Sequence, residues 1–198
     1  KARGDDVTAV CRSESNGLGQ LGVRVISGVD VSDAGSVDTM AEQLRGESFD
    51  WLINNAGVLS REGLDEMDFD AIEWQFRVNS IGPLRVTRAL LENLAPGSRV
   101  GIITSRMGSV GDNTSGGYYG YRMSKAAVNM AGMSLSRDLA SQGIAVGLLH
   151  PGMVATDMTG NNGVSVEHSA SGLIERMDEL DMQNSGSFWH AEGQQLPW

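Results

Sequence analysis

The hydrophobic and polar positions along the chain predict strands that alternate with helices. Short apolar runs led or followed by turn residues predict strands within 6–11, 23–33, 49–57, 98–105, 144–152 and near 186–191. Apolar residues at helical spacing predict helices over 36–46, 68–97, 120–143 and near 166–180. Within 68–97, the pair Gly82-Pro83 is expected to bend the helix locally.

This alternation predicts a particular kind of sheet. Strands separated by helices of this length pair in parallel through right-handed crossovers, and a parallel sheet is covered on both faces, which suits apolar strands. The expected fold class is therefore α/β: a Rossmann-type doubly wound parallel sheet with helices on both faces, in one domain over residues 1–198. Such sheets bind ligands outside the carboxyl ends of their strands, so the segments after the strands are the first place to look for a site.

Composition narrows the class of protein. Hydrophobic residues make up 40% of the chain and charged residues 20%, which is typical of a globular protein rather than a disordered one. A formal net charge of -10 argues against binding of nucleic acid through its phosphates. No apolar run approaches the roughly 20 residues that cross a membrane, so we expect no membrane contact. A single cysteine, Cys11, fits a reducing, cytoplasmic compartment, and the three histidines form no metal-ligand pattern with it.

A tyrosine and a lysine carry the clearest chemical signal. Lys125 is the only lysine besides Lys1, in a chain with 15 lysines and arginines together, and it follows Tyr121 by four residues. On a helix the two side chains share one face, where an ammonium is expected to lower the pKa of the phenol. Such a tyrosine can exchange a proton with a carbonyl or an alcohol near neutral pH, and Ser105, at a strand end, can bond the same oxygen. The alternative is a surface tyrosine stacked on a lysine stem.

Three other segments follow strands or interrupt helices. Asn54-Asn55-Ala56-Gly57 offers a small-residue turn that lets a flat ligand approach the backbone, or is an ordinary turn. Asn79 is a poor residue for a helix interior, so it is either a tolerated polar residue or a buried group near the site. Pro151-Gly152 turns the chain, and Thr156 either bonds a ligand or caps a turn.

Together these residues carry a resemblance. The motifs resemble those of the short-chain dehydrogenase/reductase family over essentially the whole chain: Tyr121-x-x-Ser124-Lys125, Asn54-Asn55-Ala56-Gly57, Asn79, Ser105 and Pro151-Gly152-x-Val154-x-Thr156. The stretch 104–130 is most similar to the C-factor-like carbonyl reductase branch of that family.

The resemblance implies hydride transfer between a nicotinamide and a carbonyl or alcohol substrate. Tyr121 would be the general acid/base, with Lys125 lowering its pKa and holding the nicotinamide ribose. Ser105 would polarise the substrate oxygen, and Asn79 would hold a relay water. The resemblance also implies a homodimer or homotetramer formed through the helices within 68–94 and 120–142.

The resemblance further implies a cofactor site. Its residues would be Tyr121 and Lys125 with Arg12, Asp30, Val31, Asn55, Ala56, Gly57, Pro151, Gly152, Val154 and Thr156. Asp30 corresponds to an adenine-contacting aspartate. Cys11 stands where NAD-preferring members carry an acidic residue, and Arg12 follows it. A basic residue there resembles the NADP-preferring members, because a guanidinium can pair with the 2'-phosphate, so NADP is favoured over NAD; the alternative is a solvent-facing arginine.

The choice of serine stays open. Ser105 lies sixteen residues before Tyr121 and Ser109 lies twelve before it, and neither has the family's usual spacing of thirteen. We favour Ser105, because it ends the strand 98–105 as the family's serine does.

The chain departs from the family at its start. The family's first strand and its Gly-rich phosphate loop are missing. The stretch 15–22 is rich in glycine, but it follows the family's second strand and does not open a helix with the right spacing. The strands at 6–11 and 50–54 are thus expected to lack their shared neighbour. Either about 25 to 30 further residues precede Lys1 in the natural protein, judged from the size of a βα unit, or the sheet is rearranged. The alternative to an enzyme is a truncated, non-catalytic member that serves as a binding or signalling module.

Overall fold

The computed structural model describes residues 1–198, apart from the side chain of Asn16. Its strands are β1 (Thr8–Val10), β2 (Arg24–Ile26), β3 (Trp51–Asn54), β4 (Arg99–Ile103), β5 (Ala145–His150) and β6 (Phe188–His190). Its α-helices are α1 (Asn16–Gly19), α2 (Ala34–Gln43), α3 (Phe69–Phe76), α4 (Gly82–Ala89), α5 (Tyr119–Asp138) and α6 (Val166–Glu179). A π-helix covers Arg77–Ile81, and single 3₁₀ turns cover Leu91–Asn93, Arg106–Gly108, Ala140–Gln142 and Asp157–Thr159.

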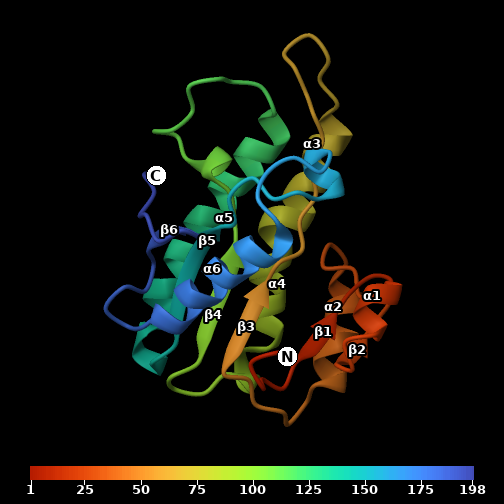
Figure 1. Ribbon diagram of the computed structural model, residues 1–198, viewed down its shortest axis with the longest axis vertical. Coiled ribbons are helices and arrows are strands. Elements are labelled where there is room, and N and C mark those ends of the chain that lie inside the picture. Colours follow the sequence, from red (N-terminus) through yellow and green to blue (C-terminus); the bar gives the residue numbers. More distant parts are fainter.

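The strands form two parallel sheets. One has the order β1-β2 and the other the order β3-β4-β5-β6, and every paired strand runs parallel to its neighbour. Figure 1 shows the smaller sheet, with α1 and α2, beside the β3 edge of the larger one. Among the described residues no ladder joins β1 to β3. Strands at 6–11 and 50–54 without a shared neighbour are what the sequence predicts.

Helices cover both faces of the larger sheet, as predicted. On one face, Val128 of α5 packs with alternate strand residues such as Ile102 and Leu148. On the other face, Met177 of α6 packs with Ala145 and Leu149. In Figure 1, α6 lies in front of the strands while α4 and α5 lie behind them. The strand alternation thus divides the core into two layers, as a buried parallel sheet requires.

Close packing at glycine fixes the distance between sheet and helices at two places. A Cβ on Gly132 of α5 would lie 2.5 Å from Leu148 Cδ2, and one on Gly101 of β4 would lie 2.6 Å from Met177 Sδ. Both separations are shorter than van der Waals contact, so α5 and α6 approach the sheet at these points because no side chain intervenes.

One detail of the predicted elements needs correction. The expected helix 68–97 is α3, a π-helix and α4 in series, and the irregularity lies at 77–81, just before the expected bend at Gly82-Pro83. The glycine-rich stretch 15–22 also contains a single helical turn, α1, in which the Ser15 hydroxyl accepts a hydrogen bond from Leu18 N at 3.2 Å.

Candidate active site

Ser105, Tyr121 and Lys125 converge where β4 meets α5. Tyr121 lies in the first turn of α5, and its phenol hydrogen-bonds the hydroxyl of Ser105, which lies two residues after the end of β4 and caps the turn Arg106–Gly108. The Lys125 ammonium lies 5.7 Å from the centre of the Tyr121 ring and donates to the Ile103 carbonyl at 2.9 Å. The exposed fractions of the three residues are 7%, 9% and 4% in chain order. The shared face expected for Tyr121 and Lys125 is present.

The direction of the tyrosine pKa differs from the sequence expectation. Burial raises the pKa of Tyr121 above its ordinary value, while the hydrogen bond from Ser105 acts in the opposite sense and is the weaker influence. Burial also lowers the pKa of Lys125 to about 8. The expectation that Lys125 lowers the pKa of the phenol is therefore wrong for this structure: burial raises that pKa, and the ammonium donates its hydrogen bond to Ile103 O.

Ser109 is buried but occupied elsewhere. Its hydroxyl accepts a hydrogen bond from Asp112 N at 3.0 Å and so shapes the turn after the 3₁₀ segment Arg106–Gly108. Ser105 instead faces the Tyr121 phenol. Of the two serines considered from sequence, the structure brings only Ser105 to the tyrosine.

Asn79 lies within the π-helix and is buried, at 1% exposed. Its amide bonds the backbone of Val58 twice, accepting from Val58 N at 2.8 Å and donating to Val58 O at 2.9 Å. It also donates to Ser124 Oγ at 3.0 Å, so it joins α5 to the loop after β3. The π-helix disrupts the regular ladder of backbone hydrogen bonds beside Asn79, which is common at functional sites.

The loop after β3 borders the same place. Asn55 and Ala56 are exposed, and Gly57 is half-buried. The Cβ position of Gly57 lies 3.6 Å from Lys125 Nζ and 3.5 Å from Asn79 Oδ1. Asn54, the first residue of the motif, is buried and donates to Thr87 Oγ1 at 3.1 Å, which fastens the start of this loop to α4.

Arg12 and Asp30 lie close together at the carboxyl end of the smaller sheet. The Asp30 carboxylate accepts from Ser32 N at 2.8 Å and Ser32 Oγ at 2.7 Å, and these bonds lower its pKa, with a smaller contribution from the charge of Arg12. The Val31 carbonyl accepts from Arg85 of α4 at 2.7 Å. Arg12 itself is exposed, so its guanidinium can reach a ligand.

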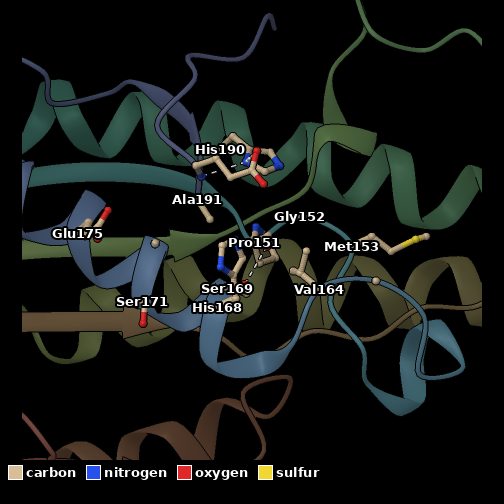
Figure 2. A pocket seen from close by; sticks show the side chains of 13 residues that line it. Pro151, Gly152, Met153, Val164, His168, Ser169, Ser171, Glu175, His190 and Ala191 are labelled. Atoms are coloured by element: carbon tan, nitrogen blue, oxygen red, sulfur yellow. Dashed lines mark hydrogen bonds and ion pairs between the residues drawn. The ribbon is translucent and has the colours of Figure 1, made fainter.

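The segment after β5 borders a cavity of about 420 Å³ (Figure 2). Pro151 and Gly152 line it together with Ser169 and His190, and Figure 2 shows the Ser169 hydroxyl bonding the Pro151 carbonyl, at 2.7 Å. Ser105, Tyr121 and Lys125 do not line this cavity. It therefore adjoins the predicted cofactor segment without containing the tyrosine.

Val154 and Thr156 are engaged within their own loop. Thr156 caps the turn Asp157–Thr159, and its N–H donates to Thr159 Oγ1 at 3.2 Å, so the capping alternative for this residue is present. The Val154 carbonyl accepts from Thr159 Oγ1 at 2.5 Å. Both residues lie on the chain that leaves Gly152, whose φ of +81° favours glycine.

Sequence reasoning missed two buried polar pairs near the site. Thr104, beside Ser105, donates to Asn129 Oδ1 at 2.6 Å, and Gln75 of α3 bonds Ser60 and Glu62 in the loop after β3. A signal was available for Gln75, because it lies three residues after the core residue Ile72 on the buried side of a helix. Glu62 had no such signal, since a glutamate in a loop is normally exposed.

The Lys125 ammonium keeps donors that a ligand can use. The buried Lys125 ammonium uses one N–H on Ile103 O, and among the described residues it has no carboxylate partner. A buried cation with unused donors suits a ligand rich in hydroxyl and phosphate oxygens.

The described residues contain no group of three or more histidine, cysteine, aspartate or glutamate side chains that could hold a metal ion. In the same part of the chain, no helix is long and apolar enough to cross a membrane.

Known proteins resemble this chain in sequence and in structure. Residues 2–166 match the short chain dehydrogenase family. The 1-hydroxy-2-glutathionyl-2-methyl-3-butene dehydrogenase of Rhodococcus sp. (strain AD45) is 43% identical over 203 residues, which cover 99% of this chain and 90% of that protein. C-signal of Myxococcus xanthus is 46% identical over 153 residues, 75% of this chain and 92% of that protein.

Solved carbonyl reductases share the fold. The carbonyl reductase of Pseudomonas aeruginosa PAO1 in complex with NADP is 33% identical, with a TM-score of 0.83, and the match covers 100% of this chain and 90% of that one. The NADPH-bound carbonyl reductase from chicken fatty liver is 29% identical, with a TM-score of 0.86, over 96% and 87% of the two chains. Both neighbours hold the cofactor expected from Arg12, which supports that expectation.

Proposed function

The chain belongs to the short-chain dehydrogenase family of oxidoreductases, and we propose that it is an NADP(H)-dependent carbonyl reductase or alcohol dehydrogenase. The single observation that carries this proposal is the convergence of Ser105, Tyr121 and Lys125 beside the loop at Gly57. These residues come from the segment after β4, from α5 and from the loop after β3, and the family motif assigns each a part in one reaction.

In the reducing direction the nicotinamide, when bound, supplies hydride to the carbonyl carbon. The Tyr121 phenol donates its proton to the carbonyl oxygen, and the Ser105 hydroxyl bonds that same oxygen and orients it. The raised pKa of Tyr121 keeps the phenol protonated at neutral pH, which suits an acid. The alcohol product forms when the carbonyl carbon has gained hydride and the oxygen has gained the proton.

Lys125 and Asn79 act around this step. The Lys125 ammonium would hold the ribose hydroxyls of the cofactor and stabilise the phenolate left after proton transfer. Asn79 fixes the Val58 backbone and, with the π-helix, would hold a water through which the phenol regains its proton. Asn55, Ala56, Gly57, Pro151, Gly152, Val154 and Thr156 would line the cofactor, and Asp30 and Val31 would lie at its adenine.

Arg12 would select NADP through its 2'-phosphate. A titration of the purified chain with NADPH and with NADH, followed by nicotinamide fluorescence, tests cofactor binding. Arg12→Ala is expected to weaken NADPH binding about tenfold or more and to leave NADH binding unchanged, because only the former ligand loses a charge-assisted bond. Arg45→Ala, which removes an exposed arginine just past the C-terminal end of α2, is the matched control.

Turnover is then tested on a panel of carbonyls and alcohols with a stoichiometric readout of NADPH. A glutathione-conjugated alcohol belongs in the panel, because the relative from Rhodococcus is named for such a substrate. Oxidation or reduction of any member that is lost in Tyr121→Phe supports the proposal. Absence of cofactor binding by the wild-type chain contradicts it.

A binding or signalling role is the second candidate. The 46% identity to C-signal of Myxococcus xanthus favours it. A chain with this role would bind neither NADPH nor NADH, so the same titration separates the two candidates.

For the assembled enzyme we propose one domain over 1–198, a homo-oligomeric state and a cytoplasmic location.

A further inference from the structure

A buried carboxylate lies behind the catalytic helix. Glu62, in the loop between β3 and α3, is 4% exposed although it belongs to an otherwise exposed stretch of sequence. Its Oε1 accepts from Gln75 Nε2 at 2.9 Å and from the hydroxyl of Ser60, and its Oε2 accepts from the backbone N–H of Gly120 at 3.4 Å. A buried carboxylate with three donors is compensated for the loss of water.

Those donors come from three different elements. Gln75 belongs to α3 and is fully buried; it also accepts from Ser60 N at 3.1 Å and donates to Ser60 Oγ at 2.6 Å. Gly120 belongs to the first turn of α5. A Cβ on Gly120 would lie 2.3 Å from Gln75 Nε2, so α3 and α5 touch here with no side chain between them. Glu62 is thus bonded to both helices at their point of closest approach.

The start of α5 lacks a cap from its own sequence. Its N-cap residue, Tyr118, has a left-handed backbone with φ of +51° and makes no side-chain cap bond. The first backbone N–H groups of a helix have no partner within the helix, and capping residues usually satisfy them. Here Glu62 supplies acceptors for two backbone N–H groups at the start of α5: its backbone carbonyl accepts from Tyr118 N at 2.9 Å, and its side-chain carboxylate accepts from Gly120 N. The negative charge also lies at the positive end of a 20-residue helix.

We propose that Glu62 is a remote cap that positions the catalytic tyrosine. Gly120 directly precedes Tyr121, so the carboxylate fixes the turn from which the phenol reaches Ser105. Glu62 does not touch the reacting atoms, and it acts through α5. This proposal rests on the proposed function for its catalytic consequence, but the capping of α5 can be measured without turnover.

The test compares Glu62→Ala and the near-isosteric Glu62→Gln with Asp65→Asn, an exposed carboxylate in the same loop that undergoes the same charge change. Amide hydrogen exchange by NMR is expected to accelerate roughly five- to tenfold at residues 119–121 in Glu62→Ala, because a cap is lost. The carbon-13 signal of the Tyr121 ring Cζ is expected to shift in the same variant. Glu62→Gln retains one acceptor and recovers part of both effects, and Asp65→Asn matches the wild type.

Turnover supplies the functional arm. In Glu62→Ala, kcat is expected to fall about 10- to 100-fold while KM for NADPH changes less than about twofold, because the phenol is displaced and the cofactor contacts are not. Unchanged exchange at 119–121, or an unshifted Tyr121 signal, would overturn the proposal. So would a normal kcat in a variant whose helix start exchanges faster. If the wild-type chain shows no turnover, the proposed function fails, while exchange and the Tyr121 signal still decide whether Glu62 positions the tyrosine.

Discussion

At the scale of single residues, the protonation of the site depends on how much water each buried group loses: burial raises the pKa of Tyr121 and lowers the pKa of Lys125. Spacing alone put Tyr121 and Lys125 on one helix face, and the position of Ser105 at a strand end selected it over Ser109. The direction of the pKa shift of Tyr121 could not be predicted from the sequence, because it depends on how much water each group loses in the folded state. The same holds for Glu62, whose burial depends on donors 13 and 58 residues away.

Removing each serine separately tests the assignment of Ser105. Ser105→Ala is expected to lower kcat about 10²- to 10³-fold, the usual effect of deleting one donor to a reacting oxygen. Ser109→Ala is expected to leave turnover near the wild-type rate and to lower the free energy of unfolding by about 1 kcal/mol, because Asp112 N loses its acceptor. Steady-state kinetics and urea unfolding measure the two effects. Turnover abolished in Ser109→Ala but retained in Ser105→Ala would reverse the assignment.

The buried ammonium predicts a pH-dependent stability. The pKa of Lys125 is about 8 in the fold and near 10.5 in the unfolded chain, so below pH 8 the fold carries a disfavoured buried charge. Between pH 8 and pH 10.5 the unfolded chain binds more protons at Lys125 than the folded chain does, so the free energy of unfolding rises with pH in this range. Lys125→Met is therefore expected to raise the free energy of unfolding at pH 7 by up to about 3 kcal/mol, with the gain shrinking to zero above about pH 10.5.

Thermal melts of wild type and Lys125→Met at several pH values check this, with the exposed Lys1→Met as the control for loss of a lysine. A variant that is less stable at pH 7 would show that the Ile103 contact outweighs the burial of charge. Lys125→Met is also expected to lose activity, so in that case the variant would lose both activity and stability at pH 7.

At the scale of elements, the spacing of apolar residues predicted where helices and strands form. It did not predict where a helix becomes irregular, because that depends on particular hydrogen bonds. The segment 68–97 was expected to be one long helix with a bend at proline, whereas the structure has a π-helix at Arg77–Ile81 ahead of Pro83. A π-helix depends on contacts such as those of Asn79 with Val58 and Ser124, which lie 21 and 45 residues away. The pattern of apolar residues along one helix does not contain that information.

The contact of the 3₁₀ turn with α5 makes a prediction at this scale. A Cβ on Gly108 would lie 2.6 Å from the backbone carbon of Lys125 and 2.8 Å from its oxygen, and backbone atoms of a helix cannot move aside cheaply. Gly108→Ala is thus expected to displace the turn that follows Ser105, to lower the free energy of unfolding by about 1–3 kcal/mol and to reduce kcat. Denaturant unfolding and steady-state kinetics measure both.

Gly63→Ala provides the control, since nothing lies within 4 Å of its Cβ position. Equal effects of the two substitutions would mean that added chain stiffness, and not the contact with α5, is responsible. A stable and fully active Gly108→Ala would show that the turn can shift without moving Ser105.

At the scale of the whole molecule, the parallel sheet and its two helical layers were predictable, and so was the break between β1 and β3. Each of the two strands that flank this break has one exposed apolar residue: Val10 of β1 is 40% exposed and Ile53 of β3 is 46% exposed. Strand residues in a doubly covered parallel sheet are normally buried. How the smaller sheet sits beside the larger one was not predictable, because α2 and α4 hold it through core residues such as Met40 and Val86.

Exposed apolar side chains on the long helices predict self-association. Met123 and Met130 of α5 lie seven residues apart and are 50% and 68% exposed. On the other long helical segment, Trp74 of α3 and Ile81 of the π-helix are 40% and 45% exposed. Side chains seven residues apart share a helix face, and such exposed apolar residues commonly mark an interface. With a net charge of -10, two copies would repel one another at low salt, so association should strengthen as salt screens that charge.

Light scattering at micromolar concentration is expected to give at least a dimer mass for the wild type. Met130→Glu should shift it toward the monomer, whereas Val110→Glu, on an exposed loop residue that is 79% accessible, should not. A monomer mass for the wild type at every salt concentration would contradict the homo-oligomer, and equal effects of the two glutamates would assign the association to general surface hydrophobicity rather than to the face of α5.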